Sequence, residues 1–498
     1  MADLARLLGG PSGRGNIANG ADDLVPQNDQ ARAQQWHIVE SHNGHIPSTW
    51  DGAMPSRTAP CVSLAVSTDL KQWNYRYMFE KKGERSLVLD SRLNAMADVL
   101  QQAFGLTSEW EDPTIPSQES IYTVGRICMR VDAAKSDAAL PTKLTPTELM
   151  LETSRMVGNG QRVPLSLDPK CRVRYAWTDE NAAMSSVVGL FPGMIVGLKG
   201  RNGSGGRFVA EELWMPPALP HPATSRTELQ SHQYHPTKLN GAQLRMVAVS
   251  GPFTLPSDLA FTPWHAFVSH MERLQPDVLL VMGPFVSASH PRVASGDMDA
   301  LPTELFEQHI ARRLARLMER SPSTMVILVP STEDIFHPHC AFPQPFFDKT
   351  DAALGLPKRV RCLPNPSVFY VNELAIGVTT ADVLGDLRRE ELVQRVQPTN
   401  ATGTPAPKAG DPMMRLTRHL LGQRRVKSFV RVVDSTAVVN PGTLAPPGAD
   451  AQSSSFVLVQ VDPLPRDSVF RSGAEADELI THDLYNRARI DLVHTSTA

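Results

Sequence analysis

The fold of this chain is decided by the stretch Pro276-Asp-Val-Leu-Leu-Val-Met-Gly-Pro-Phe-Val-Ser287. It begins with a continuous apolar run, which is typical of a strand buried on both faces of a sheet, and then turns at Gly-Pro. Similar apolar runs occupy 244–250, 323–330 and 454–461. Residues 261–274 lie between the runs at 244–250 and 276–287, and residues 302–320 lie between that run and the one at 323–330. Both segments have the three- and four-residue apolar spacing of helices. Strands that alternate with helices predict an α/β domain, which we place at 244–498.

The overall composition is that of a globular protein. Hydrophobic residues make up 41% and charged residues 20% of the 498 positions, a length that allows two to four domains of about 150 residues each. The net charge of −3 provides no global basic field, so any nucleic-acid surface must be local. Five cysteines without a Cys-x-x-Cys pair exclude a cysteine-rich zinc ribbon and indicate a reducing compartment. Without an apolar run of about 18 residues, we expect a soluble intracellular protein.

The spacing of apolar residues and turn residues changes upstream of the α/β domain. Residues 71–115 have a helical apolar spacing and form a helical lead-in. Residues 116–220 contain several short strands with Pro-Gly and Gly-Ser-Gly-Gly turns, which predicts a small closed barrel of the OB type. We expect the remaining segments to be irregular: an N-terminal arm at 1–70, a Pro- and His-rich linker at 221–243, and a surface insertion near 398–412.

Ligand chemistry in an α/β sheet lies at the carboxyl ends of the strands. The segments that follow these strands are Ser250-Gly-Pro-Phe253, Gly283-Pro-Phe-Val-Ser287, Pro330-Ser-Thr-Glu-Asp334 and Asn440-Pro-Gly442. Their order resembles that of the calcineurin-like metallophosphoesterases, whose strand ends carry the carboxylates and imidazoles that hold two metal ions. The positions of those former ligands are occupied here by Gly251, Phe253, Pro284, Ser287, Ser331 and Thr332. Since Gly, Phe and Pro side chains offer a metal ion no donor, we expect no metal, no cofactor and no catalytic residue.

Eight motifs in a fixed order carry a second, broader resemblance between residues 77 and 442. They are Tyr77-Met-Phe-Glu-Lys81, Leu190-Phe-Pro-Gly-Met194, Ser250-Gly-Pro-Phe-Thr254, the stretch from Arg273 to Val286, Val329-Pro-Ser331, Phe342-Pro-Gln-Pro345, Gly377-Val-Thr-Thr-Ala-Asp382 and Val439-Asn-Pro-Gly442. The set resembles the B subunits of eukaryotic replicative DNA polymerases. The doubled Gly-Pro-Phe favours the branch of that family that serves polymerase α–primase over the δ and ε branches.

The resemblance implies a fold and a role. The fold is an OB-fold domain packed on an inactive calcineurin-like phosphoesterase domain. The role is that of a nuclear, non-catalytic accessory subunit for the initiation of DNA replication. Such a subunit binds the C-terminal domain of the polymerase α catalytic subunit, reaches the primase subunits through the complex, touches DNA indirectly or weakly, and contacts no membrane. The alternatives are an active metal-dependent phosphoesterase or exonuclease, a B subunit of polymerase δ or ε, and a barrel that binds single-stranded DNA.

Two groups of residues are candidate contacts. Lys199, Arg201 and Arg207 flank the Gly-rich hairpin of the barrel and could meet a phosphate backbone, although aromatic stacking partners are sparse there. Pro252, Phe253, Pro284 and Phe285 stand at the strand ends and could form a partner surface. In the alternative interpretation, the two phenyl rings fold inward and fill the vacated metal cavity. We interpret His337-Pro-His339-Cys340 and the Glu333-Asp334 pair as structural rather than metal-binding or catalytic.

Overall fold

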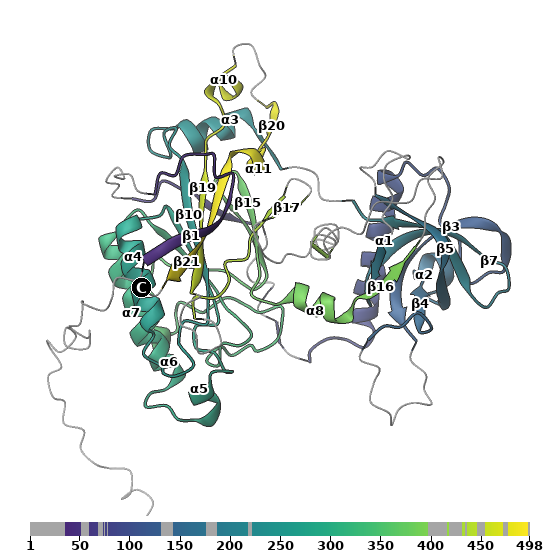
Figure 1. Ribbon diagram of the computed structural model, residues 1–498, viewed down its shortest axis with the longest axis horizontal. Coiled ribbons are helices and arrows are strands. Elements are labelled where there is room, and N and C mark those ends of the chain that lie inside the picture. Colours follow the sequence, from purple (N-terminus) through teal and green to yellow (C-terminus); the bar gives the residue numbers. More distant parts are fainter. Residues whose placement is uncertain are drawn as a thin grey trace, which may run out of the picture.

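A computed structural model of the chain describes residues 35–50, 59–67, 73, 75–76, 78–130, 143–175, 187–217, 222–396, 416–417, 431–433, 436–445, 454–471 and 477–496. Figure 1 shows a β-barrel beside a larger α/β body, with the helix α8 extending from the body toward the barrel. None of the helices in this part of the chain is long and apolar enough to cross a membrane.

A seven-stranded sheet forms the centre of the α/β body. Its order is β1-β21-β19-β10-β11-β12-β13. The parallel half consists of β10 (Leu244–Ser250), β11 (Val278–Met282), β12 (Met325–Val329) and β13 (Arg361–Cys362). The antiparallel half consists of β19 (Ser455–Val461), β21 (Ala488–Ser496) and, at the edge, β1 (Gln35–His42). The strand runs predicted from the sequence are therefore the centre of this sheet.

Different layers cover the two faces of the large sheet. Helices α4 (Thr262–Leu274) and α7 (Arg312–Arg320) lie on one side in Figure 1, and they pack with one set of strand side chains, including Val247 and Val249. The chain continues into α7 from α6 (Pro302–Leu305) and a π-helix (Phe306–Ala311). The opposite face packs on a three-stranded sheet of β2 (Leu64–Val66), β14 (Ser367–Val371) and β15 (Leu374–Val378).

The barrel closes through five strands. They are β3 (Ser117–Met129), β4 (Leu149–Glu152), β5 (Arg162–Tyr175), β7 (Ile195–Asn202) and β8 (Phe208–Met215). A short helix α2 (Arg155–Gly158) joins β4 to β5, and α1 (Glu84–Ala103) packs its buried stripe of Leu93, Met96, Ala97 and Leu100 on the outside of the barrel. The five strands close through four antiparallel pairings and one parallel pairing, between β5 and β8, and hydrophobic side chains fill the interior. These are the expected features of an OB fold.

A strap connects the two bodies. It consists of α8 (Val383–Glu390) and β16 (Leu392–Arg395), and β16 pairs antiparallel with β6 (Val187–Leu190) beside the barrel. Leu387, Leu392 and Val396 of this strap pack on the hydrophobic core of the barrel. The sequence of the α/β body therefore supplies a strand that pairs beside the closed barrel rather than within it.

Two of the predicted irregular segments contain regular structure. The expected irregular arm at 1–70 contributes β1 to the large sheet and β2 to the small one, so that prediction is wrong for these residues. The expected linker at 221–243 instead forms β9 (Ala223–Ser225), α3 (Arg226–Leu229) and a π-helix (Gln230–Tyr234), and β9 pairs with β20 (Leu479–Thr481). Polar, Pro-rich composition is misleading in both places because the stabilising partners are distant in sequence: β21 for β1, β14 for β2 and β20 for β9. The expected insertion at 398–412 lies outside the described residues.

The remaining elements are short. They are α5 (Pro291–Ser295), a 3₁₀ turn (Ala352–Leu354), β17 (Arg431–Val433), β18 (Thr436–Val438), α10 (Arg466–Val469) and α11 (Leu484–Arg487).

Candidate functional site

Two Gly-Pro turns lie side by side at the carboxyl ends of β10 and β11. A Cβ atom added to Gly251 would overlap the carbonyl oxygen of Pro284. A Cβ atom added to Gly283 would lie 2.5 Å from the Oδ2 atom of Asp334, closer than real Cβ atoms approach their neighbours. The position that the phosphoesterase resemblance assigns to the first metal ligand is therefore filled by backbone, and no carboxylate can stand there without moving the neighbouring turn.

Asp334 ties the loops after β11 and β12 together. Its carboxylate is 2% exposed and accepts backbone N–H groups from Phe285 (2.5 Å) and Val286 (3.2 Å) on Oδ1 and from Ser331 (2.8 Å) on Oδ2. Burial raises the pKa of Asp334 to about 7, while the three N–H donors act in the opposite direction because they favour the charged form. These bonds give Asp334 a structural role between the two loops.

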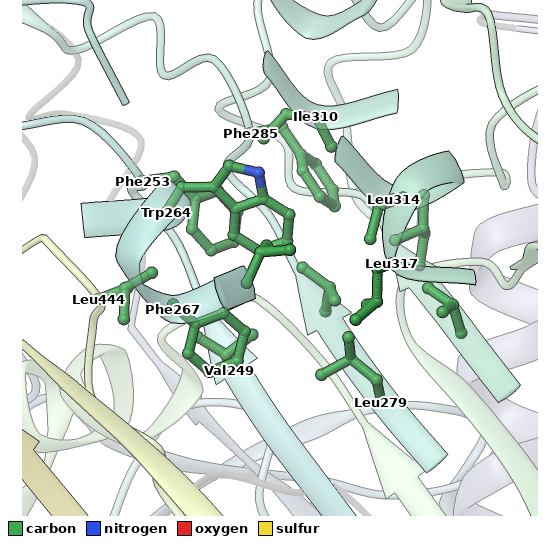
Figure 2. Packing of buried hydrophobic residues seen from close by; sticks show 14 of the residues in the cluster. Val249, Phe253, Trp264, Phe267, Leu279, Phe285, Ile310, Leu314, Leu317 and Leu444 are labelled. Carbon is green, nitrogen blue, oxygen red and sulfur yellow. The ribbon is translucent and has the colours of Figure 1, made fainter. Parts of the chain in front are cut away.

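Phe253 and Phe285 are core residues. Their side chains are 0% and 1% exposed, and their ring centroids lie 5.5 Å apart. Phe253 also packs on Trp264 at 4.9 Å, and Figure 2 shows all three side chains gathered between the sheet and its helices. The hypothesis that these two rings form a partner surface is therefore corrected: both point inward, because burying about 200 Å² of aromatic surface is strongly favourable. Only Pro252 and Pro284 of that group remain half-exposed.

Hydroxyl groups occupy three further positions that the phosphoesterase resemblance assigns to metal ligands: Ser287, Ser331 and Thr332. Ser287 donates to Glu333 (3.1 Å) and lies 2.8 Å from the hydroxyl of Ser289, while Ser331 accepts the backbone N–H of Glu333 and Thr332 is half-buried. Among the residues that the structure describes, no group of three or more His, Cys, Asp or Glu side chains could hold a metal ion. The hydroxyls lie beside the carboxylates of Glu333 and Asp334, which already accept hydrogen bonds, and hydroxyls themselves are poor ligands for a dication.

The His337-Pro-His339-Cys340 segment is a tight turn. The Nδ1 atom of His337 accepts the backbone N–H of His339 at 3.0 Å, and burial lowers the pKa of His337, so this imidazole is neutral and already engaged. The ring of His339 meets Tyr75 edge-on at 5.6 Å, and the Tyr75 hydroxyl donates to the carbonyl of Pro343. The turn therefore contacts the segment that leads into the barrel.

The three candidate DNA contacts lie together on the β7–β8 hairpin, but most of their charge is engaged. Lys199 places its ammonium 5.1 Å from the centroid of Tyr122, and the Nε atom of Arg201 lies 3.5 Å from a carboxylate oxygen of Glu211. Arg207 is exposed. Two aromatic side chains of β8 cannot stack on bases, because Phe208 is fully buried in the barrel and Trp214 is 2% exposed beneath α1.

The strap and the polar residues at its base were not predicted from the sequence. The base is formed by Gln344, Asn365 and Thr380; Gln344 and Thr380 lie in motifs identified above, whereas Asn365 lies outside all of them. The only sequence signal for the strap itself is the apolar spacing of Leu384, Leu387 and Leu392, which is too short to predict what it packs on.

Known proteins resemble this chain over most of its length. The sequence model of the family of DNA polymerase alpha/epsilon B subunits matches residues 246–428, and that of the OB domain of the DNA polymerase alpha B subunit matches residues 86–176. Three relatives are each named as the B subunit of DNA polymerase alpha. The Schizosaccharomyces pombe protein is 30% identical over 371 residues, the Saccharomyces cerevisiae protein 27% over 500, and the Bos taurus protein 25% over 401. The matches cover 74%, 87% and 80% of this chain, which spans 58%, 67% and 58% of the respective relatives.

Proposed function

Because the chain belongs to the family of DNA polymerase alpha B subunits, we propose that it is a non-catalytic accessory subunit of the polymerase α–primase complex. It holds the C-terminal domain of the catalytic subunit, is linked to the primase subunits through that chain, and acts in the nucleus at the initiation of DNA replication. The observation that carries the proposal is the filled strand-end edge, where Gly251 and Gly283 are packed against backbone and against Asp334. Such an edge has no room for the ligands of a two-metal hydrolase.

The proposed fold assignment is an OB-fold domain joined to an inactive calcineurin-like phosphoesterase domain. It is supported by the order of the strand-end motifs and by the large sheet with helices on one face and a small sheet on the other. The assignment is tested by incubating the full chain with model phosphodiesters and DNA ends in Mn²⁺, Mg²⁺ or Zn²⁺. We expect no hydrolysis above buffer. Metal-dependent turnover that remains constant per milligram through repeated purification would overturn the assignment.

The scaffold role is tested by co-expression with the C-terminal domain of a polymerase α catalytic chain. We expect the two chains to elute together from gel filtration as one complex that survives dilution, because permanent complexes bury more than about 2,000 Å². Separate elution of two folded chains would contradict the role. The B-subunit roles for polymerases δ and ε predict instead that the catalytic chains of those enzymes co-elute, so they serve as matched partners in the same experiment.

A further inference from the structure

The strap is anchored to the barrel through a short ladder and apolar contacts. Leu392 pairs with Leu190 and Arg395 with Val187, so the ladder is four residues long. Val188 and Leu190 of β6 are buried at 1% and 0% exposure within the hydrophobic cluster that fills the barrel, and Val396 of the strap joins the same cluster. The strap is therefore fastened to the barrel by pairing and packing, and Figure 1 shows α8 reaching from the α/β body to this contact.

At its other end, the strap begins at a helix cap. The Asp382 side chain accepts the backbone N–H of Gly385 at 3.0 Å, which satisfies one of the free N–H groups in the first turn of α8. The residues just before this cap are held by one buried side chain. Asn365, which is 0% exposed, donates to the Thr380 hydroxyl (2.6 Å) and accepts the Thr380 N–H and the Thr379 hydroxyl, both at 3.1 Å.

Asn365 is in turn tied to the strand-end edge of the large sheet. Its backbone exchanges two hydrogen bonds with Gln344, at 2.7 and 2.9 Å. Gln344 is 0% exposed and donates its side-chain amide to the carbonyls of Ser331 (3.0 Å) and His339 (2.8 Å). The Thr380 hydroxyl adds a direct bond of 3.0 Å to the carbonyl of Pro330, the residue that follows β12.

These contacts form one continuous network from the end of β12 to the cap of α8. Buried hydrogen bonds fix the orientation of the groups they join more strictly than apolar packing does, because a hydrogen bond weakens steeply when its donor–hydrogen–acceptor angle changes. Helix α8 has eight residues and is about 12 Å long, so it transmits the direction set at its base. A small rotation at Thr380 would become a displacement of the barrel at the far end of the strap.

We propose that Gln344, Asn365 and Thr380 are positioning residues that fix the orientation of the strap and thereby the placement of the barrel relative to the large sheet. This gives a physical role to the Phe342-Pro-Gln-Pro345 and Gly377–Asp382 motifs, which meet in this network. The proposal concerns geometry within this chain and does not depend on the proposed accessory function.

The test measures the distance between barrel and body in the full chain. Spin labels are attached at Ser204→Cys on the β7–β8 turn and at Ser295→Cys at the end of α5, in a background in which exposed Cys340 is Ser. Thr380→Val keeps the shape of the side chain but removes its hydroxyl. The matched control is Thr324→Val, since buried Thr324 also donates its hydroxyl to a proline carbonyl, that of Pro276 at 2.7 Å, at the opposite end of β12.

We expect Thr380→Val to give a distance distribution about twice as broad as wild type, with Thr380→Ser restoring it and Thr324→Val leaving it unchanged. An unchanged distribution in Thr380→Val, or the same broadening in Thr324→Val, would overturn the proposal. If Thr380→Val does not fold, Asp382→Ala removes the exposed cap at the same junction. The same broadening is expected in that variant, and its absence would equally overturn the proposal. Neither result bears on whether the chain binds a polymerase.

Discussion

Replacing Phe285 with alanine distinguishes a core residue from a partner contact. The Phe285 side chain is 1% exposed, and its ring lies 5.5 Å from each of the rings of Phe253, Phe306 and Phe347. Truncating a buried phenylalanine to alanine costs about 3–5 kcal/mol, because the apolar surface is lost and a cavity remains. In a body of this size each kcal/mol lowers the melting temperature by about 2–4 °C, so Phe285→Ala should melt about 10 °C below wild type.

The assay is a thermal melt of the full chain followed by near-ultraviolet circular dichroism, which reports on aromatic packing. Phe79→Ala is the matched control, because the Phe79 ring is 73% exposed and this change should stay within about 0.5 kcal/mol of wild type. The double variant with Phe253→Ala should cost less than the sum of the two single changes, since the rings touch. A Phe285→Ala protein that melts like wild type but no longer binds the catalytic chain would refute the core assignment.

Three further predictions concern the cations of the barrel hairpin, the buried carboxyl of Asp334 and the close packing at Gly251. Replacing Lys199, Arg201 and Arg207 together by Glu should abolish whatever weak, steeply salt-dependent DNA binding the chain shows in fluorescence anisotropy; binding that persists unchanged would remove these cations from the interface. The stability of wild type relative to Asp334→Asn should fall by about 2 kcal/mol between pH 5 and 7, because the folded carboxyl with its pKa of about 7 keeps a proton that the unfolded chain, titrating near pH 4, has already lost. A difference that is flat with pH, measured by urea unfolding, would show that the three N–H donors keep Asp334 ionised. Finally, Gly251→Ala should destabilise the chain by more than about 2 kcal/mol, as its Cβ meets backbone, and a melt equal to wild type would contradict this packing.

The parts of the fold that could be predicted from the sequence are those whose signal is local. The buried strand at Val278–Met282 is apolar throughout, and the helix at 262–274 repeats apolar residues every three or four positions, so each pattern has one interpretation. The strand β1 has no such pattern: His37, Ile38 and Val39 are all exposed, and pairing with β21 at the other end of the chain makes them a strand. No local pattern could reveal that partner.

Some features of the candidate site could likewise be predicted from the sequence, and others could not. The absence of ligand side chains at Gly251 and Pro284 is visible in the sequence, because it depends only on residue type. The direction of Phe253 and Phe285 is not visible, since a phenylalanine after a strand can point into the core or out of it with the same local sequence. The network around Asn365 is hidden for a further reason, because it joins side chains from three separate loops, and only the fold brings them together.

The central claim, that this chain is an accessory subunit of a polymerase complex, is tested most directly by the mass of the native particle. The chain, tagged at its own locus, is purified from its own cells under physiological salt and measured by gel filtration with multi-angle light scattering, followed by mass spectrometry of the peak. We expect one particle that contains the chain and a large DNA polymerase catalytic chain in equal amounts, together with primase. A folded particle of 54.6 kDa that contains this chain alone would contradict the account.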